Sequence, residues 1–131
     1  MVREDKFLFG KRNDSKSWYA GVWDIFGGFA NTGENPFQTL KRELYEELGI
    51  SPEKYELFAA VDLFDKDTDS KIIYYVYFVT DWAGQPEIRD PEHSEIKWFS
   101  RAELDSLQLA SAEYLQLIDT WSKGRSMDNI L

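Results

Sequence analysis

Residues 28–50 of this chain read GFANTGENPFQTLKRELYEELGI, and this stretch decides how the rest of the sequence is interpreted. It opens as an irregular loop and continues as a helix with a clearly marked beginning. Asn35 is a favourable N-cap, Pro36 suits the first helical position, and Gln38 completes an Asn-x-x-Gln variant of the capping box. These signals predict a helix that begins directly after Asn35.

The helix carries a single apolar stripe. Phe37, Leu40, Leu44 and Leu48 recur at helical spacing and are expected to anchor the helix against a sheet. Gly49 follows the last of them and is expected to end the helix, because glycine adopts the left-handed cap conformation without strain. The remaining faces of the helix are left for polar groups.

Three glutamates share one of these polar faces. Glu43, Glu46 and Glu47 stand at positions i, i+3 and i+4, where like charges cost about 0.2–0.5 kcal/mol per pair in an exposed helix. Three unrelieved glutamates beside a glycine-rich loop are explained if a divalent cation neutralises them. Their hard oxygen ligands favour Mg²⁺ or Mn²⁺ over zinc. We expect Arg42 to brace the cluster by pairing with Glu34 from the loop.

The spacing of these residues forms a specific pattern, G-x5-E-x7-R-E-U-x-E-E-x-G-U, in which U is aliphatic. It matches every fixed position of the Nudix box, and the chain resembles the small MutT-like branch of the Nudix hydrolase family. Weaker signs of the same resemblance are Lys11-Arg12 after a strand, Trp23 ahead of the box, and Glu92 shortly before Trp98. The sequence departs from many relatives at Asn31, where a glutamate is common, so an outer metal contact is in doubt.

The resemblance implies a role for each group of residues. It implies that the box glutamates coordinate two or more metal ions, that a glycine carbonyl adds a ligand, and that an ion pair supports the loop. It further implies a downstream glutamate that acts as metal ligand or general base. The residues in these roles are Glu43, Glu46 and Glu47 for the metal, Gly27 or else Gly28 for the carbonyl, Glu34 with Arg42 for the ion pair, and Glu92, with Glu95 as its rival.

The activity implied by the resemblance is metal-dependent hydrolysis of a diphosphate bond in a nucleoside diphosphate linked to another group. The favoured substrate is a nucleoside triphosphate, oxidised dGTP being the usual MutT-like choice, which gives a monophosphate and pyrophosphate. A nucleotide sugar or ADP-ribose is the first alternative, and a nucleotide sensor without turnover is the second. An isopentenyl-diphosphate isomerase shares the fold but usually employs a cysteine, which this sequence lacks.

Composition narrows the class of protein. With 131 residues, 43% of them hydrophobic, the chain is expected to form a single domain over residues 1–131. No apolar run is long enough to span a membrane. A net charge of -9 is a poor match for nucleic acid or an anionic membrane, but it suits a phosphate-bearing small molecule bound through a cation. The absence of cysteine suits a reducing cytoplasm.

The expected fold class is α/β, a Nudix-like α/β/α sandwich with a mixed central sheet. Only Met1 and Val2 precede the first clear strand, so the first strand of the fold is expected to be shortened or missing. An exposed sheet edge would favour pairing with a second copy, and we therefore expect a homodimer. The other predicted elements are strands over residues 6–11, 22–26, 55–64, 72–82 and 94–99, a short helix opened by Ser100 and Glu103, and a final helix over residues 111–121.

Several other residues have two readings each. Lys11 and Arg12 suit phosphate binding and a sheet edge equally. His93 suits an auxiliary base, although a solvated or structural histidine is the commoner case. Asp65, Asp67 and Asp69 alternate as in a calcium loop, but Ser70 and Val76 stand where that loop needs a glycine and a glutamate, so a polar hairpin tip is expected. The aromatic residues Trp18, Tyr19, Trp23 and Phe26 could stack on a base, but aromatics near sheet ends are usually core.

Overall fold

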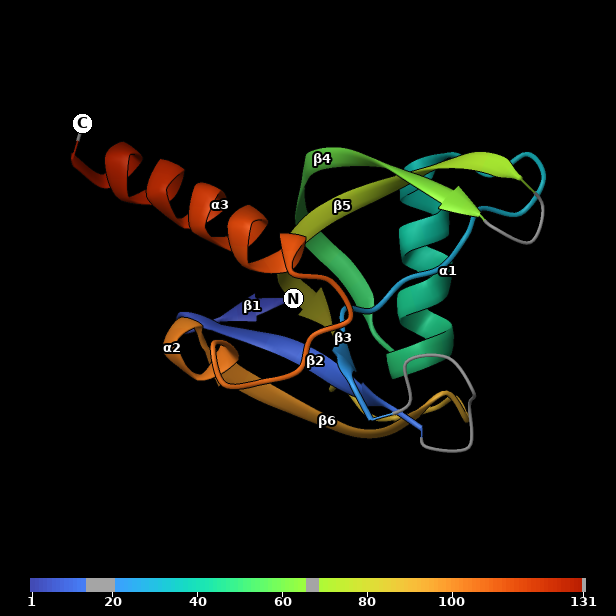
Figure 1. Cartoon of the computed structure of the whole chain (residues 1–131), viewed down its shortest axis with the longest axis horizontal. Helices are drawn as coiled ribbons and strands as arrows, with labels where there is room; N and C mark the ends of the chain where they lie inside the picture. The colour runs from blue at the N-terminus through green and yellow to red at the C-terminus, as the bar shows by residue number, and fades with distance from the viewer. Residues whose placement is uncertain (14–20, 66–68, 131) are drawn as a thin grey trace. The chain divides into compact units, whose positions relative to one another are not determined.

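The computed structural model describes residues 1–13, 21–65 and 69–130. Strands and helices follow one another along the chain as the sequence predicts (Figure 1). Their bounds are β1 Val2–Arg3, β2 Lys6–Arg12, β3 Trp23–Asp24, α1 Pro36–Leu48, β4 Ser51–Asp65, β5 Ser70–Ala83, β6 His93–Ser100, α2 Arg101–Leu104 and α3 Glu113–Ile130.

Internal contacts divide the chain into two compact units. The first unit comprises Met1–Val2 and Gly27–Arg89, and the second comprises Arg3–Phe26 and Asp90–Leu131. The first contains α1 and the β4–β5 hairpin, and the second contains β2, β3, β6, α2 and α3. The expectation of one domain over residues 1–131 stays a prediction.

Helix α1 begins and ends where the sequence places its boundaries. The Asn35 side chain accepts a hydrogen bond from the Gln38 backbone N–H at 2.8 Å, and the Gln38 side chain accepts one from the Asn35 N–H at 2.9 Å. Gly49 closes the helix in the left-handed conformation, with φ 72° and ψ 23°. Leu44 and Leu48 are 2% and 0% exposed. The capping box, the terminating glycine and the buried stripe at these two leucines are confirmed.

The β4–β5 hairpin is longer than the sequence suggests. Its antiparallel pairing runs from Ser51 opposite Ala83 to Asp65 opposite Ser70, so both predicted strands are confirmed and extended. Irregular register between 52 and 59 marks β-bulges in β4. Part of the polar segment that joins the strands, residues 66–68, lies outside the described residues.

The second unit is built around β2. This strand pairs antiparallel with β3 on one side and with β6 on the other, where Phe7 stands opposite Phe99. The sheet also includes β1, a strand of only two residues. Of the two predicted outcomes for the first strand, shortened or missing, the structure has the shortened one. An isolated parallel bridge between Trp23 and Leu109 is added to the antiparallel pairs. Leu8 and Phe9, at 2% and 1% exposure, form part of the core.

The prediction of a strand over residues 22–26 is wrong in its length. Strand β3 spans only Trp23–Asp24. The Trp23 N–H donates to the Gln108 carbonyl oxygen at 2.9 Å, and the Ala110 N–H donates to the Trp23 carbonyl oxygen at 2.9 Å. The next N–H, of Ile25, is taken by the Asp24 side chain at 2.8 Å. A side-chain oxygen thus replaces the strand partner that would have continued β3.

The two C-terminal helices differ in how well the sequence predicts them. The Ser100 and Glu103 capping box of α2 is confirmed. Helix α3 runs to Ile130, well beyond the predicted end at Trp121, although Ile118 and Trp121 are buried as expected. In the described parts of the chain, no helix has the length and apolar character needed to cross a membrane.

Candidate active site

Arg42, in the middle of α1, holds the loop that precedes the helix. Its Nε donates to Glu34 Oε2 at 2.7 Å, and its Nη2 donates to Glu34 Oε1 at 3.0 Å, which makes the ion pair bidentate. Nη2 also donates to the Phe29 carbonyl oxygen at 3.0 Å. The predicted Glu34–Arg42 ion pair is confirmed, and it ties both ends of the loop to the helix.

Glu34 receives further hydrogen bonds. The Asn31 backbone N–H donates to Glu34 Oε1 at 2.7 Å, and the Thr39 hydroxyl donates to the same oxygen at 3.3 Å. The hydrogen bond from Arg42, followed by that from Asn31, lowers the pKa of Glu34 to about 2. The hydrogen bond to Glu34 in turn raises the pKa of Arg42 above its usual value. Both groups therefore remain charged at neutral pH.

The three helix glutamates have different surroundings. Arg42 Nη1 donates to Glu43 Oε1 at 2.8 Å and to Glu46 Oε2 at 3.2 Å. The Glu43 side chain is 15% exposed and the Glu46 side chain 56% exposed. The expectation that all three carboxylates are unrelieved is therefore wrong for Glu43 and Glu46, because Arg42 offsets part of their charge. Glu46 remains accessible to a ligand from solvent.

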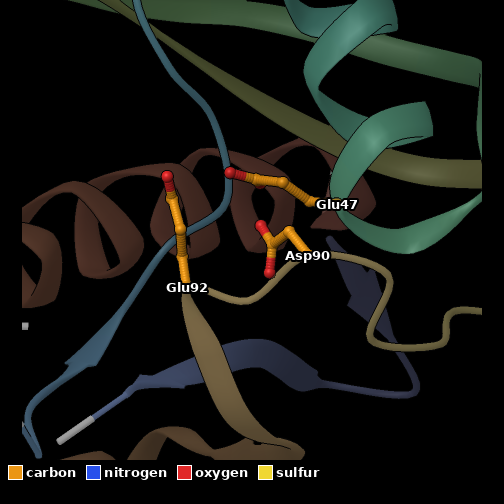
Figure 2. Close-up of side chains that lie close together, drawn as sticks. All are labelled: Glu47, Asp90 and Glu92. Atoms are coloured by element: carbon orange, nitrogen blue, oxygen red, sulfur yellow. The ribbon is translucent and has the colours of Figure 1, made fainter. Parts of the chain in front are cut away.

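Glu47 is the buried member of the set. It is 5% exposed and lies on the last turn of α1 (Figure 2). Its Oε2 accepts a hydrogen bond from the Gly27 backbone N–H at 3.1 Å. A buried carboxylate is costly unless it is hydrogen-bonded or coordinates a cation. The Gly27 contact places this glutamate against the loop that begins the box.

The two glycines before the helix allow the close approach of loop and carboxylates. A Cβ added at Gly28 would fall on the carboxylate of Glu43. Gly27 has φ +150°, and a Cβ there would lie 2.9 Å from the Tyr74 hydroxyl oxygen. Side chains at these two positions would therefore displace groups of the site. This is the physical reason for the glycine pair.

The second unit contains the downstream acid, Glu92. Figure 2 shows Asp90 and Glu92 on the segment that leads into β6. One carboxylate oxygen of Asp90 and one of Glu92 lie within 4.8 Å of each other. His93, the next residue, is buried and contacts Asp90 Oδ1 through its Nδ1 at 3.1 Å. His93 is therefore not solvated, but its buried contact with Asp90 fits the structural half of the same expectation. A role as auxiliary base stays a prediction.

The basic residues at the end of β2 are only partly explained. Arg12 Nη1 pairs with Asp24 Oδ2 at 3.4 Å, and Asp24 also accepts a hydrogen bond from the Tyr114 hydroxyl at 2.6 Å. These contacts support the sheet-edge reading of Arg12. Phosphate binding by Lys11 or Arg12 stays a prediction.

The sequence did not indicate Asp90 or Asn13 as residues of this region. Some of the residues that it did indicate lie outside the described part of the chain. The spacing of Asp90 and His93, three residues apart, was the available signal for their contact. Asn13 contacts the same segment from a distant position, which no local pattern indicates. Trp18, Tyr19 and Asp67 are the candidates that lie outside the described residues.

In the first unit, the carboxylates of α1 therefore lie beside the Gly27–Gly28 loop. Arg42 holds the segment that follows these glycines to the same helix. Three carboxylates at two adjacent turns of one helix, with a glycine backbone beside them, suit Mg²⁺ or Mn²⁺. The arrangement can hold a divalent cation and, through the cation, a phosphate-bearing ligand.

Comparison with known proteins agrees with this assignment. The model of the NUDIX domain family matches residues 1–119. An 8-oxo-dGTP diphosphatase of Haemophilus influenzae is 39% identical, over 72% of this chain and 66% of the relative. A CTP pyrophosphohydrolase of Escherichia coli is 32% identical, over 86% of this chain and 80% of the relative.

Solved structures confirm the predicted α/β fold class. The crystal structure of a MutT NUDIX hydrolase from Burkholderia pseudomallei superposes with a TM-score of 0.77 at 30% identity, and the match covers 89% of each chain. The box over residues 28–50, the Glu34–Arg42 ion pair and these similarities lead to one conclusion: the chain belongs to the NUDIX domain family.

Proposed function

We propose that this Nudix pyrophosphohydrolase cleaves a nucleoside triphosphate, including an oxidised one, to a nucleoside monophosphate and pyrophosphate. The observation that carries the proposal is the set of carboxylates on α1, held beside the Gly27–Gly28 loop by Arg42 and Glu34. The relatives named 8-oxo-dGTP diphosphatase and CTP pyrophosphohydrolase support a triphosphate as substrate.

The donor set fits Mg²⁺, or Mn²⁺ in its place. Glu43, Glu46, Glu47 and the Gly27 carbonyl would hold the cation. A role for Glu92 as metal ligand or general base is proposed from the family resemblance alone. We infer two or more ions when substrate is present. Bound cations would neutralise the diphosphate oxygens and supply Lewis acidity toward them.

The reaction requires one water molecule per turnover. Its oxygen forms a bond to one of the two phosphorus atoms of the cleaved anhydride, and the bond from that phosphorus to the bridging oxygen breaks. The water proton passes to a carboxylate, for which Glu92 and the box glutamates are the candidates, and the other half of the anhydride leaves with the electron pair on the bridging oxygen. Arg42 does not take part in proton transfer, because its charge is fixed by Glu34; it keeps the carboxylates and the loop in place.

The experiment is a substrate panel. Release of product would be measured from nucleoside triphosphates, oxidised dNTPs, nucleotide sugars, ADP-ribose and dinucleoside polyphosphates, with Mg²⁺, with Mn²⁺ and with chelator. We expect cleavage of triphosphates that chelator abolishes and that Glu46→Gln strongly reduces. Cleavage confined to nucleotide sugars or ADP-ribose would replace the substrate class. Metal and nucleotide binding without any turnover would support a sensor.

The assembly and location of the protein are also proposed. A homodimer would cover the sheet edge next to the two-residue β1, and light scattering after size exclusion would contradict it by giving the mass of a monomer. A cysteine-free acidic chain suits the cytoplasm.

A further inference from the structure

A histidine–carboxylate pair, of which the histidine is buried and the aspartate partly buried, lies next to Glu92 in the second unit. His93 Nδ1 is 3.1 Å from Asp90 Oδ1, and the side chains of the two residues are 4% and 14% exposed. An ionised carboxylate can only accept a hydrogen bond, so the contact is a hydrogen bond from His93 to Asp90 in the tautomer that carries the proton on Nδ1. The pair closes a short turn whose third residue is Glu92.

The histidine ring is fixed on its other sides. Its centroid lies 5.0 Å from that of Phe26, and a Cβ at Gly10 would lie 2.6 Å from its Cδ2 and 2.9 Å from the Phe26 ring. The glycine on β2 therefore makes room for both rings. Among the described residues, Nε2 of His93 is buried and has no hydrogen-bond partner. Within the described part of the chain, the hydrogen bond of the ring is therefore the one made through Nδ1 to Asp90.

The turn is also held from the β2 side. The Asn13 side chain donates to the Pro91 carbonyl oxygen at 3.1 Å, and the Asn13 backbone N–H donates to the Glu92 carbonyl oxygen at 2.8 Å. The backbone of Glu92 is therefore fixed by Asn13, and the residues on either side of it are fixed by the Asp90–His93 contact. The backbone from which the Glu92 side chain extends is therefore held both by Asn13 and by the Asp90–His93 contact.

We propose that Asp90 and His93 are positioning residues for Glu92. They hold the Asp90-Pro91-Glu92-His93 turn so that the Glu92 carboxylate is presented in one orientation for the reaction. The inference rests on the proposed function, because it assumes that Glu92 takes part in catalysis. An apolar pair could replace this partly buried pair in a merely structural role. We therefore assign the pair to fixing the geometry of the turn.

Variants of Asp90 test the inference without disturbing the core. Asp90→Ala removes the hydrogen-bond acceptor, and we expect kcat to fall roughly 10- to 100-fold with little change in KM. Asp90→Asn keeps an acceptor oxygen for His93 and should recover most of the kcat. His93→Phe keeps the ring but removes the donor, so it should resemble Asp90→Ala. Asp105→Ala, which breaks an exposed ion pair with Arg101 in the same unit, is the control and should leave kcat unchanged.

Glu92→Gln as a second background separates this inference from the proposed function. If Asp90 acts through Glu92, Asp90→Ala should lower kcat in the wild type and have no further effect in the Glu92→Gln protein. Full additivity of the two substitutions would overturn the positioning role, and so would an Asp90→Asn protein as impaired as Asp90→Ala, because the charge itself would then matter. If Glu92→Gln retains full kcat in an enzyme that hydrolyses triphosphate, the inference fails while the proposed activity stands.

Discussion

The helix α1 and the turn from Asp90 to His93 carry the acidic residues of the proposed reaction, but they are held in different ways. The groups that fix α1 lie within a few residues of one another, as in the Asn35–Gln38 capping box and the Glu34–Arg42 ion pair. The turn has one local contact, between Asp90 and His93, and it is also held by Asn13, whose side-chain partner Pro91 is 78 residues away in the sequence. Local contacts can be deduced from spacing, whereas distant ones appear only when the chain is folded.

Within the α1 region itself, substitutions are expected to have two kinds of effect. In the α1 region a small change beside the carboxylates should lower activity at once, while a change at the cap should lower stability. The three predictions that follow sharpen that comparison and run from the larger expected effect to the smaller.

Gly28→Ala should impair catalysis far more than folding. The new methyl group would displace the Glu43 carboxylate, which can move because it ends a flexible side chain. We expect this displacement to lower kcat on the order of 10²-fold, as a shift of about 1 Å in an active site can do. Steady-state kinetics and denaturant unfolding would be measured together. Gly124→Ala is the control: nothing lies within 4 Å of its added Cβ, and it should keep kcat while stabilising α3 by about 0.4–1 kcal/mol. A Gly28→Ala enzyme with normal kcat would contradict the claim that the close approach of Gly28 to the Glu43 carboxylate is needed for catalysis.

Glu34→Gln should change how stability depends on pH. The pKa of Glu34 is lowered from 4.5 to about 2 by its hydrogen bonds, chiefly that from Arg42. A lowered pKa stabilises the folded state above the unfolded value, and this contribution is lost as the pH falls from 4.5 toward 2. The free energy of unfolding should therefore differ between wild type and variant at neutral pH and converge at low pH. A difference that is constant across this range would show that the charge of Glu34 does not contribute.

Asn35→Ala should have the smallest effect, and on stability alone. It removes the acceptor for the Gln38 backbone N–H but leaves the loop and the carboxylates in place. The expected loss is about 1 kcal/mol in the free energy of unfolding. Urea denaturation would measure it, with kcat as the control that should not change. A large fall in kcat at unchanged stability would mean that the cap positions the glutamates directly.

The sequence predicted the α1 region almost completely, because each of its features has a local signal. Asn35, Pro36 and Gly49 mark the helix ends, and the spacing from Glu34 to Arg42 suggested their ion pair. Reasoning from charge alone nevertheless missed that Arg42 also reaches Glu43 and Glu46. An arginine side chain can donate hydrogen bonds to several carboxylates, so a prediction that pairs it with one of them misses the others.

Outside that region the sequence was less informative, for physical reasons that differ from case to case. Strand β3 was predicted too long because the Asp24 side chain, and no other strand, satisfies the Ile25 N–H. Helix α3 was predicted too short because Gly124 is unfavourable in a helix interior, yet it does not end this one. The Asp90–His93 contact was missed because its importance depends on Gly10 and Phe26, which only the fold brings together.

The most direct test of the central claim is the kcat of Glu46→Gln on the best triphosphate substrate at saturating Mg²⁺. This variant keeps the size of the side chain and an acceptor oxygen for Arg42, and it removes only the charge offered to the cation. We predict a fall in kcat of roughly 10²–10⁴-fold with the fold intact. A Glu46→Gln enzyme with the kcat and metal dependence of the wild type would contradict the claim that the carboxylates of α1 form the metal site.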